Sequence, residues 1–132
     1  MSGPLLLDTS SLIALFENIG RAAEVISDYS RVVIPTVVCG EFDSGTQGDT
    51  ARERAQRDSL ANFLATPNVS VLPITRNTAS FYAKVYVYLR KAGKPIPIND
   101  IWMAAATMET AGILCTDDRR LLSLPLIRTT GF

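Results

Sequence analysis

Histidine is absent from the 132-residue sequence, and cysteine occurs only twice, at Cys39 and Cys115. Without histidine there is no imidazole for a serine or cysteine triad, and two distant cysteines outside a CxxC pair do not make a zinc site. Each cysteine lies in an apolar segment, where a small buried hydrophobic side chain is expected. Carboxylate, hydroxyl and amide groups therefore remain for chemistry, and their oxygen atoms suit hard cations such as Mg²⁺ and Mn²⁺.

The sequence also lacks an excess of charge of either sign and any long apolar run. Its 13 basic residues balance 13 acidic residues, so binding to nucleic acid would depend on a local patch. No apolar run approaches the roughly 20 residues of a membrane span. The start, MSGP, lacks the basic region and the apolar segment of a signal peptide. We therefore expect a cytoplasmic protein with no membrane association.

Length and hydrophobic patterning predict one α/β domain over residues 1–132. A chain of this length buries roughly 65–70% of the surface that its unfolded form exposes. Short apolar runs that read as buried strands lie at residues 5–7, 32–34, 69–72, 113–115 and 126–128. Their brevity and lack of clean alternation favour a parallel sheet covered on both faces. The expected fold is a three-layer sandwich in which a short parallel sheet of about five strands is flanked by helices.

Helical patterns separate these runs. Helices are expected over residues 10–17, 21–29, 36–42 and 99–111. Asp49 is expected to cap a further helix that runs to Leu64, and Thr75 another that ends at Gly93. The alternation of helices and strands supports the α/β assignment.

Acidic residues recur where a strand or loop meets a helix. Asp8 follows the first predicted strand, Asp117 and Asp118 follow the fourth, and Asp100 begins the helix that leads into the fourth. In a parallel sheet these positions share the carboxyl edge, where ligands bind. Glu41 lies about one and a half turns into its helix, roughly 9 Å along the axis, and converges less directly. Each aspartate alone could be a helix cap worth about 1 kcal/mol, but like charges that meet at one edge favour a metal site.

Four segments resemble the motifs of PIN-domain ribonucleases, in particular the VapC-type toxins of toxin–antitoxin pairs. They are LDTSSLIAL at residues 7–15, VCGEFDSG at 38–45, PINDIWMAA at 97–105 and LCTDDRRL at 114–121. Two details depart from the usual pattern: Leu121 stands where an aromatic residue is common, and Asp117 and Asp118 compete for one position. The spacing from Thr116 favours Asp118, with Asp117 in reserve.

The resemblance implies a PIN-like fold and a metal-dependent endoribonuclease that acts as the toxin of a type II toxin–antitoxin system. Such an enzyme would hydrolyse phosphodiester bonds in structured RNA, such as tRNA or rRNA, and inhibit translation. Asp8 and Asp100 would be the principal ligands of Mg²⁺ or Mn²⁺, and Glu41 and Asp118 would complete the acidic pocket. Whether one ion or two acts stays open.

The resemblance also implies two protein partners. One is a second copy of the chain in a homodimer, and the other is a small cognate antitoxin. Apolar positions around Val38, Phe42 and Phe63 are expected to be exposed for docking an antitoxin helix.

Several residues beside the acidic positions are candidates for supporting roles. Hydroxyl and amide groups that could position water or a carboxylate, or act only as helix caps, are Thr9, Ser10, Asn99 and Thr116. Arg119 and Arg120 lie beside the predicted cleft and are candidates for contact with an RNA phosphate.

Two other functions are compatible with the residues. One is a catalytically silent PIN-like binding module. The other is an aspartyl phosphotransfer enzyme with Asp8 as the nucleophile. A phosphatase of the haloacid dehalogenase kind would have a second aspartate two residues later, where this sequence has Ser10.

Overall fold

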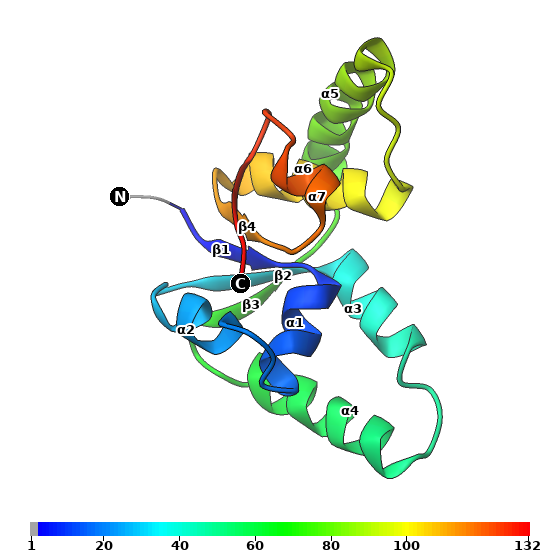
Figure 1. Cartoon of the computed structure of the whole chain (residues 1–132). Coiled ribbons are helices and arrows are strands. Elements are labelled where there is room, and N and C mark those ends of the chain that lie inside the picture. The colour runs from blue at the N-terminus through cyan, green and yellow to red at the C-terminus, as the bar shows by residue number, and fades with distance from the viewer. Residues whose placement is uncertain (1–2) are drawn as a thin grey trace.

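A computed structural model describes residues 3–132, and within this range five strands form one parallel sheet (Figure 1). The strands are β1 (Leu5–Leu7), β2 (Val32–Pro35), β3 (Val69–Leu72), β4 (Ile113–Cys115) and β5 (Arg128–Thr130). Their order in the sheet is β3-β2-β1-β4-β5. The predicted α/β fold with a parallel sheet is confirmed. Met1 and Ser2, part of the segment interpreted as lacking a signal peptide, lie outside the described residues.

Helices cover both sides of the sheet. They are α1 (Thr9–Phe16), α2 (Ala22–Ser27), α3 (Thr36–Ser44), α4 (Ala51–Leu64), α5 (Arg76–Ala92), α6 (Ile98–Thr110) and α7 (Arg119–Leu122). Figure 1 shows α5, α6 and α7 on one side and α1, α2 and α4 on the other, which gives three layers. Within residues 3–132, no helix combines the length and apolar character needed to cross a membrane.

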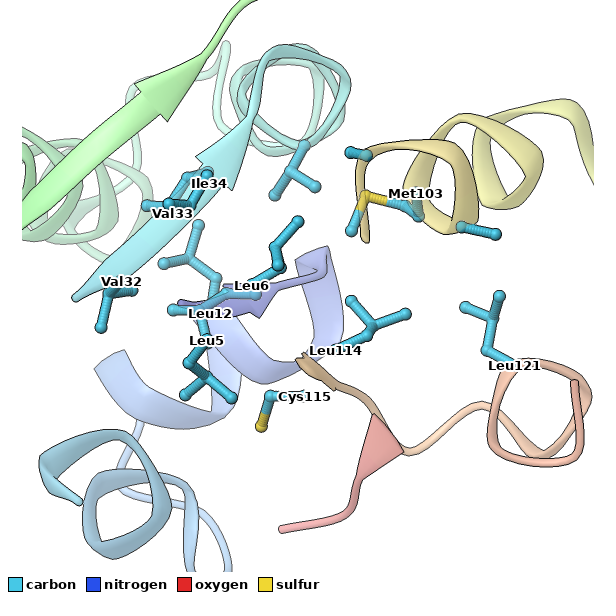
Figure 2. Packing of buried hydrophobic residues seen from close by; sticks show 14 of the residues in the cluster. Leu5, Leu6, Leu12, Val32, Val33, Ile34, Met103, Leu114, Cys115 and Leu121 are labelled. Atoms are coloured by element: carbon cyan, nitrogen blue, oxygen red, sulfur yellow. The ribbon is translucent and has the colours of Figure 1, made fainter. Parts of the chain in front are cut away.

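The core is built around the central strand β1. Leu5, Leu6 and Leu7 have no exposed surface, and β1 pairs with β2 on one side and β4 on the other. Figure 2 shows Leu6 among side chains from β2 and β4, which include Val33 and Leu114. Burial of one leucine side chain contributes about 1.5–3 kcal/mol. This packing fixes the carboxyl end of β1, where Asp8 follows.

Local capping chemistry sets several helix ends. The cap of α4 is Thr50, not the predicted Asp49, because Thr50 and Glu53 exchange hydrogen bonds in a capping box. Thr75 caps α5 as predicted, and Gly93 ends it in the left-handed conformation with φ +66°. Ala111 adopts a similar conformation at the end of α6, with φ 52°.

Near the C-terminus the predicted strand at residues 126–128 is wrong by two residues, because β5 spans Arg128–Thr130. Pro125 and Leu126 form a turn, and the apolar side chains of Leu126 and Ile127 pack against the core instead of joining the ladder. The short helix α7 was not expected from the sequence.

The predicted docking positions for an antitoxin are wrong for two of three residues. Val38 and Phe42 are buried in the core. The Phe16 ring packs edge-on against Phe42, with centroids 5.7 Å apart, and against Phe63 at 5.9 Å. These apolar side chains hold α1, α3 and α4 together, so Val38 and Phe42 are not available to a partner helix.

Candidate metal centre

Asp8 lies at the carboxyl end of β1 and begins the site. Only 8% of the residue is exposed. One of its carboxylate oxygens accepts hydrogen bonds from the backbone N–H of Ser11 and from the hydroxyl of Ser10, both at 2.9 Å. Asp8 is therefore the N-cap of α1, and its side chain is held at the sheet edge by the helix that it starts.

Glu41 joins the site through α3. Its carboxylate accepts hydrogen bonds from the Thr9 hydroxyl at 2.7 Å and from the Asn99 side-chain amide at 3.0 Å. Thr9 is the neighbour of Asp8 and Asn99 the neighbour of Asp100, so Glu41 links two acidic positions that are far apart in the sequence. The position of Glu41 within its helix did not predict this placement, because the placement depends on how α3 packs against α1 and α6 in the folded protein.

Asp100 and Asp118 lie together beside Arg120. Asp118 is the N-cap of α7, and its carboxylate accepts the Arg120 backbone N–H at 2.9 Å. The Arg120 guanidinium lies 3.2 Å from the Asp118 carboxylate and 4.0 Å from that of Asp100. Thr116 accepts a hydrogen bond from the Asp118 backbone N–H at 3.0 Å. Asp117 is exposed, so the structure brings Asp118, rather than Asp117, to Asp100.

The four carboxylates form one electrostatic group. Partial burial, followed by the charge of Asp118, raises the pKa of Asp100 to about 6, and Glu41 and Asp8 add to the effect while Arg120 opposes it. Burial also acts to raise the pKa of Asp118, but the hydrogen bonds and charge of Arg120 outweigh it, so that this pKa is lowered. Asp100 is the member of the group on which the negative charges of the other three converge.

The donor chemistry of this group fits Mg²⁺ or Mn²⁺. All the donors are oxygen atoms, and Asp100 and Asp118 are only partly exposed, so a cation would relieve their mutual repulsion. Among residues 3–132, however, no three acidic or cysteine side chains are close enough to hold one ion jointly. Their oxygens are instead held by Ser10, Thr9, Asn99 and Arg120. Side-chain rotation would be needed to form a shared ligand set.

The predicted supporting residues take distinct positions. Thr9 and Asn99 bond Glu41, Ser10 bonds Asp8, and Thr116 holds the backbone of Asp118. Arg119 is exposed at the start of α7. Sequence reasoning missed the pairing of Arg120 with Asp118, although an arginine two residues after a helix-capping aspartate is a local signal that could have indicated it.

Neither cysteine has the properties of a nucleophile. Cys115 is buried, and burial, together with the charge of Asp8, raises the pKa of its thiol to about 12. Cys39 is partly buried, and burial followed by the charge of Asp43 raises its pKa. Both thiols therefore stay protonated at neutral pH.

A parallel α/β sheet with carboxylates gathered at its carboxyl edge defines a class of proteins whose site suits a hard divalent cation. The comparison with known families narrows this class. The model of the PIN domain family matches residues 5–125, and the chain belongs to this family.

Proteins similar to this chain include VapC ribonucleases and VapBC complexes. Ribonuclease VapC5 of Mycobacterium tuberculosis is 30% identical over 113 residues, which cover 85% of this chain and 81% of that protein. The crystal structure of VapBC-5 from the same organism, a member of the VapBC family of toxin–antitoxin systems, has a TM-score of 0.72 at 26% identity and covers 98% of this chain and 97% of that chain. DNA-bound VapBC from Salmonella typhimurium shares the fold, with a TM-score of 0.83 at 21% identity and 97% coverage of both chains. The chain is thus a distant homologue of VapC ribonuclease toxins.

Proposed function

We propose that this protein is a metal-dependent endoribonuclease that acts as the toxin of a type II toxin–antitoxin system. The observation that carries the proposal is the placement of four carboxylates at the carboxyl edge of the sheet. Glu41 accepts hydrogen bonds from Thr9 and Asn99, the neighbours of Asp8 and Asp100, and the Arg120 guanidinium contacts both Asp118 and Asp100. The ribonuclease names of the relatives support the reaction class. The proposed substrate is structured RNA, such as tRNA or rRNA, and the consequence of cleavage is inhibition of translation.

The residues of the chain have separate roles in this proposal. Asp8 and Asp100 would be the principal ligands of Mg²⁺ or Mn²⁺, and Glu41 and Asp118 would act directly or through water. A bound ion would supply a water of lowered pKa and positive charge to stabilise an in-line displacement at phosphorus. Thr9 and Asn99 hold Glu41 in place. A carboxylate accepts the proton of the attacking water, because the chain has no histidine for this task.

The proposed partners are a cognate antitoxin and a second copy of the chain. The antitoxin is supported by solved structures similar to this chain, which include toxin–antitoxin complexes, whereas the homodimer follows from the family resemblance alone. Because Val38 and Phe42 are buried, these two side chains are not available to the antitoxin.

The experiment that tests the function is cleavage of a total RNA pool, with mapping of the new RNA ends. The purified protein, free of any antitoxin, is incubated with EDTA, Mg²⁺ or Mn²⁺, beside the variants Asp8→Asn and Asp100→Asn. We expect discrete metal-dependent cuts that fall by about 100-fold or more in both variants, because each removes a charged ligand of the ion. Asp118→Asn and Asp117→Asn form a matched pair, in which the first is expected to lose activity and the second to keep it.

Other outcomes would point to the alternative functions. An absence of cuts despite measured Mn²⁺ binding would overturn the nuclease assignment in favour of a binding module. An acyl-phosphate on Asp8, detected by mass spectrometry after incubation with a phosphoryl donor, would instead identify phosphotransfer. Equal activity in Asp8→Asn and the unmodified protein would show that cleavage does not depend on Asp8, and would contradict the proposed role of the acidic group.

A further inference from the structure

Arg120 is held at the acidic group by three sets of contacts. Its backbone N–H donates to the Asp118 carboxylate at 2.9 Å, and its guanidinium contacts the same carboxylate at 3.4 Å and 3.2 Å. The same guanidinium lies 4.0 Å from Asp100. One side chain of this protein thus places a positive charge between two of the four carboxylates.

The guanidinium of Arg120 therefore offsets part of the negative charge of the two carboxylates that it contacts, Asp118 at 3.2 Å and Asp100 at 4.0 Å. A divalent ion that binds Asp100 and Asp118 needs the same carboxylate oxygens and offsets the same negative charge. A divalent ion and the guanidinium repel each other at this separation, so each weakens the binding of the other to these oxygens.

Arg120 also borders a second environment. It lines a cavity of about 210 Å³ together with Lys94, Ser123 and Pro125, and none of the lining side chains is acidic. The Arg120 side chain is 56% exposed, so its guanidinium can rotate without disturbing the core. Away from Asp118, the guanidinium would join Lys94 at a basic surface, to which a phosphate is attracted.

We infer that Arg120 is an internal counter-ion of the acidic group, which the metal displaces and which then becomes available to the RNA backbone beside Lys94. This inference rests on the proposed function. It adds a positioning residue that couples the two binding events: Arg120 weakens the binding of the first metal ion, and metal binding releases a phosphate contact. In this arrangement the basic surface is complete only when the ion is in place.

The first test is Mn²⁺ binding in the absence of RNA, measured by titration calorimetry. We expect Arg120→Gln to bind Mn²⁺ roughly three- to tenfold more tightly than the unmodified protein, because the competing charge is gone. Arg120→Lys keeps a cation and is expected to stay within about twofold of the unmodified protein. Arg76→Gln is the control, because it changes the net charge by the same amount at the start of α5. The neighbouring Asn77 donates a hydrogen bond to Glu109, which lies at the opposite end of α6 from Asp100. The Mn²⁺ affinity of Arg76→Gln is expected to be unchanged.

The second test follows the guanidinium itself by NMR. The Arg120 Nε–H signal, assigned by its absence in Arg120→Lys, should exchange slowly with water in EDTA, because Asp118 holds the group. Saturation with Mg²⁺ should speed that exchange. Thermal unfolding of each variant checks that the fold is intact, and the exposure of Arg120 makes a large change in stability unexpected.

The outcomes separate this inference from the proposed function. Mn²⁺ binding of equal strength in Arg120→Gln and the unmodified protein, or an Arg120 signal that Mg²⁺ leaves unchanged, would overturn the counter-ion role and leave the nuclease proposal standing. Weaker binding in Arg120→Gln would also overturn it, because that result would make Arg120 a support for the ligands instead of a competitor. Failure of every variant and of the unmodified protein to bind Mn²⁺ would remove the basis of both proposals.

Discussion

At the scale of single residues, the acidic positions have two structural roles at once. Asp8 caps α1 and Asp118 caps α7, while both also act electrostatically on Asp100. The helix-cap interpretation and the metal-site interpretation are therefore compatible for these side chains. Each helix start holds a carboxylate at the sheet edge, and at this edge the carboxylates are near enough to interact electrostatically.

Replacement of Asp100 by asparagine is expected to stabilise the metal-free protein at neutral pH. The pKa of Asp100 in the folded protein, about 6, lies above its ordinary value of 3.8, so folding favours the protonated acid and stability is lost as the pH rises through this range. Asparagine carries no charge and avoids this loss. After allowance for solvent screening, we expect Asp100→Asn to gain about 1–2 kcal/mol at pH 7.5, measured by thermal unfolding in EDTA.

The gain should shrink as the pH falls from about 6 to about 4, since Asp100 is then protonated in the folded protein. Asp117→Asn serves as the control, because Asp117 is exposed and its replacement should change the melting temperature little. A gain that stayed constant between pH 4 and pH 8 would show that repulsion around Asp100 is not its cause.

The sequence predicted some of these residues better than others. Asp8, Asp100 and Asp118 could be placed at one edge because they adjoin strands or a returning helix, and parallel strands end at the same edge. Glu41 could be assigned only through the resemblance, because its position depends on bonds to Thr9 and Asn99 from distant parts of the chain. The contact of Arg120 with Asp100 depends on α7, which is too short to show a hydrophobic period.

At the scale of secondary-structure elements, α5 and α6 show how helix ends follow from backbone preference. Both end in the left-handed conformation, at Gly93 with φ +66° and at Ala111 with φ 52°. Glycine adopts this conformation without strain, and alanine does not. The sequence indicated the first end, but the helix that it predicted over residues 99–111 extends one residue beyond the second, because α6 ends at Thr110.

A reciprocal pair of substitutions tests this account. Gly93→Ala is expected to lower the free energy of unfolding by about 1 kcal/mol, although a Cβ at Gly93 would meet no atom within 4 Å. Ala111→Gly is expected to raise it by about 0.5–1 kcal/mol, because strain at Ala111 is relieved. Urea unfolding measures both. Changes of the same sign in the two variants would contradict the role given to backbone strain.

At the scale of the whole molecule, stability depends on the central strand. Leu6 has no exposed surface and pairs with Val33 of β2 and Leu114 of β4. Leu6→Ala is expected to cost about 2–5 kcal/mol, a large share of the roughly 5–15 kcal/mol typical of a domain. Leu122→Ala is the control, since Leu122 is 40% exposed, and it should cost less than about 0.5 kcal/mol in the same urea titration. Equal costs would contradict the placement of the core around β1.

The overall architecture followed from the sequence because strand and helix periods alternate along the chain. Strand order was not predicted, since several orders bury the same apolar runs. The shift of β5 to Arg128–Thr130 shows the same limit, because Leu126 and Ile127 are apolar in a turn as they would be in a strand.

The sheet order also has a consequence for synthesis on the ribosome. β1 emerges first, yet one of its two neighbours is β4, and Leu5 pairs with Ile113. β1 therefore cannot pair with β4 until the nascent chain has reached about residue 115, and Asp118 is added after that. A nascent chain that ends before residue 118 therefore lacks one of the four carboxylates as well as the full set of strand pairs, so the complete acidic group cannot form on it.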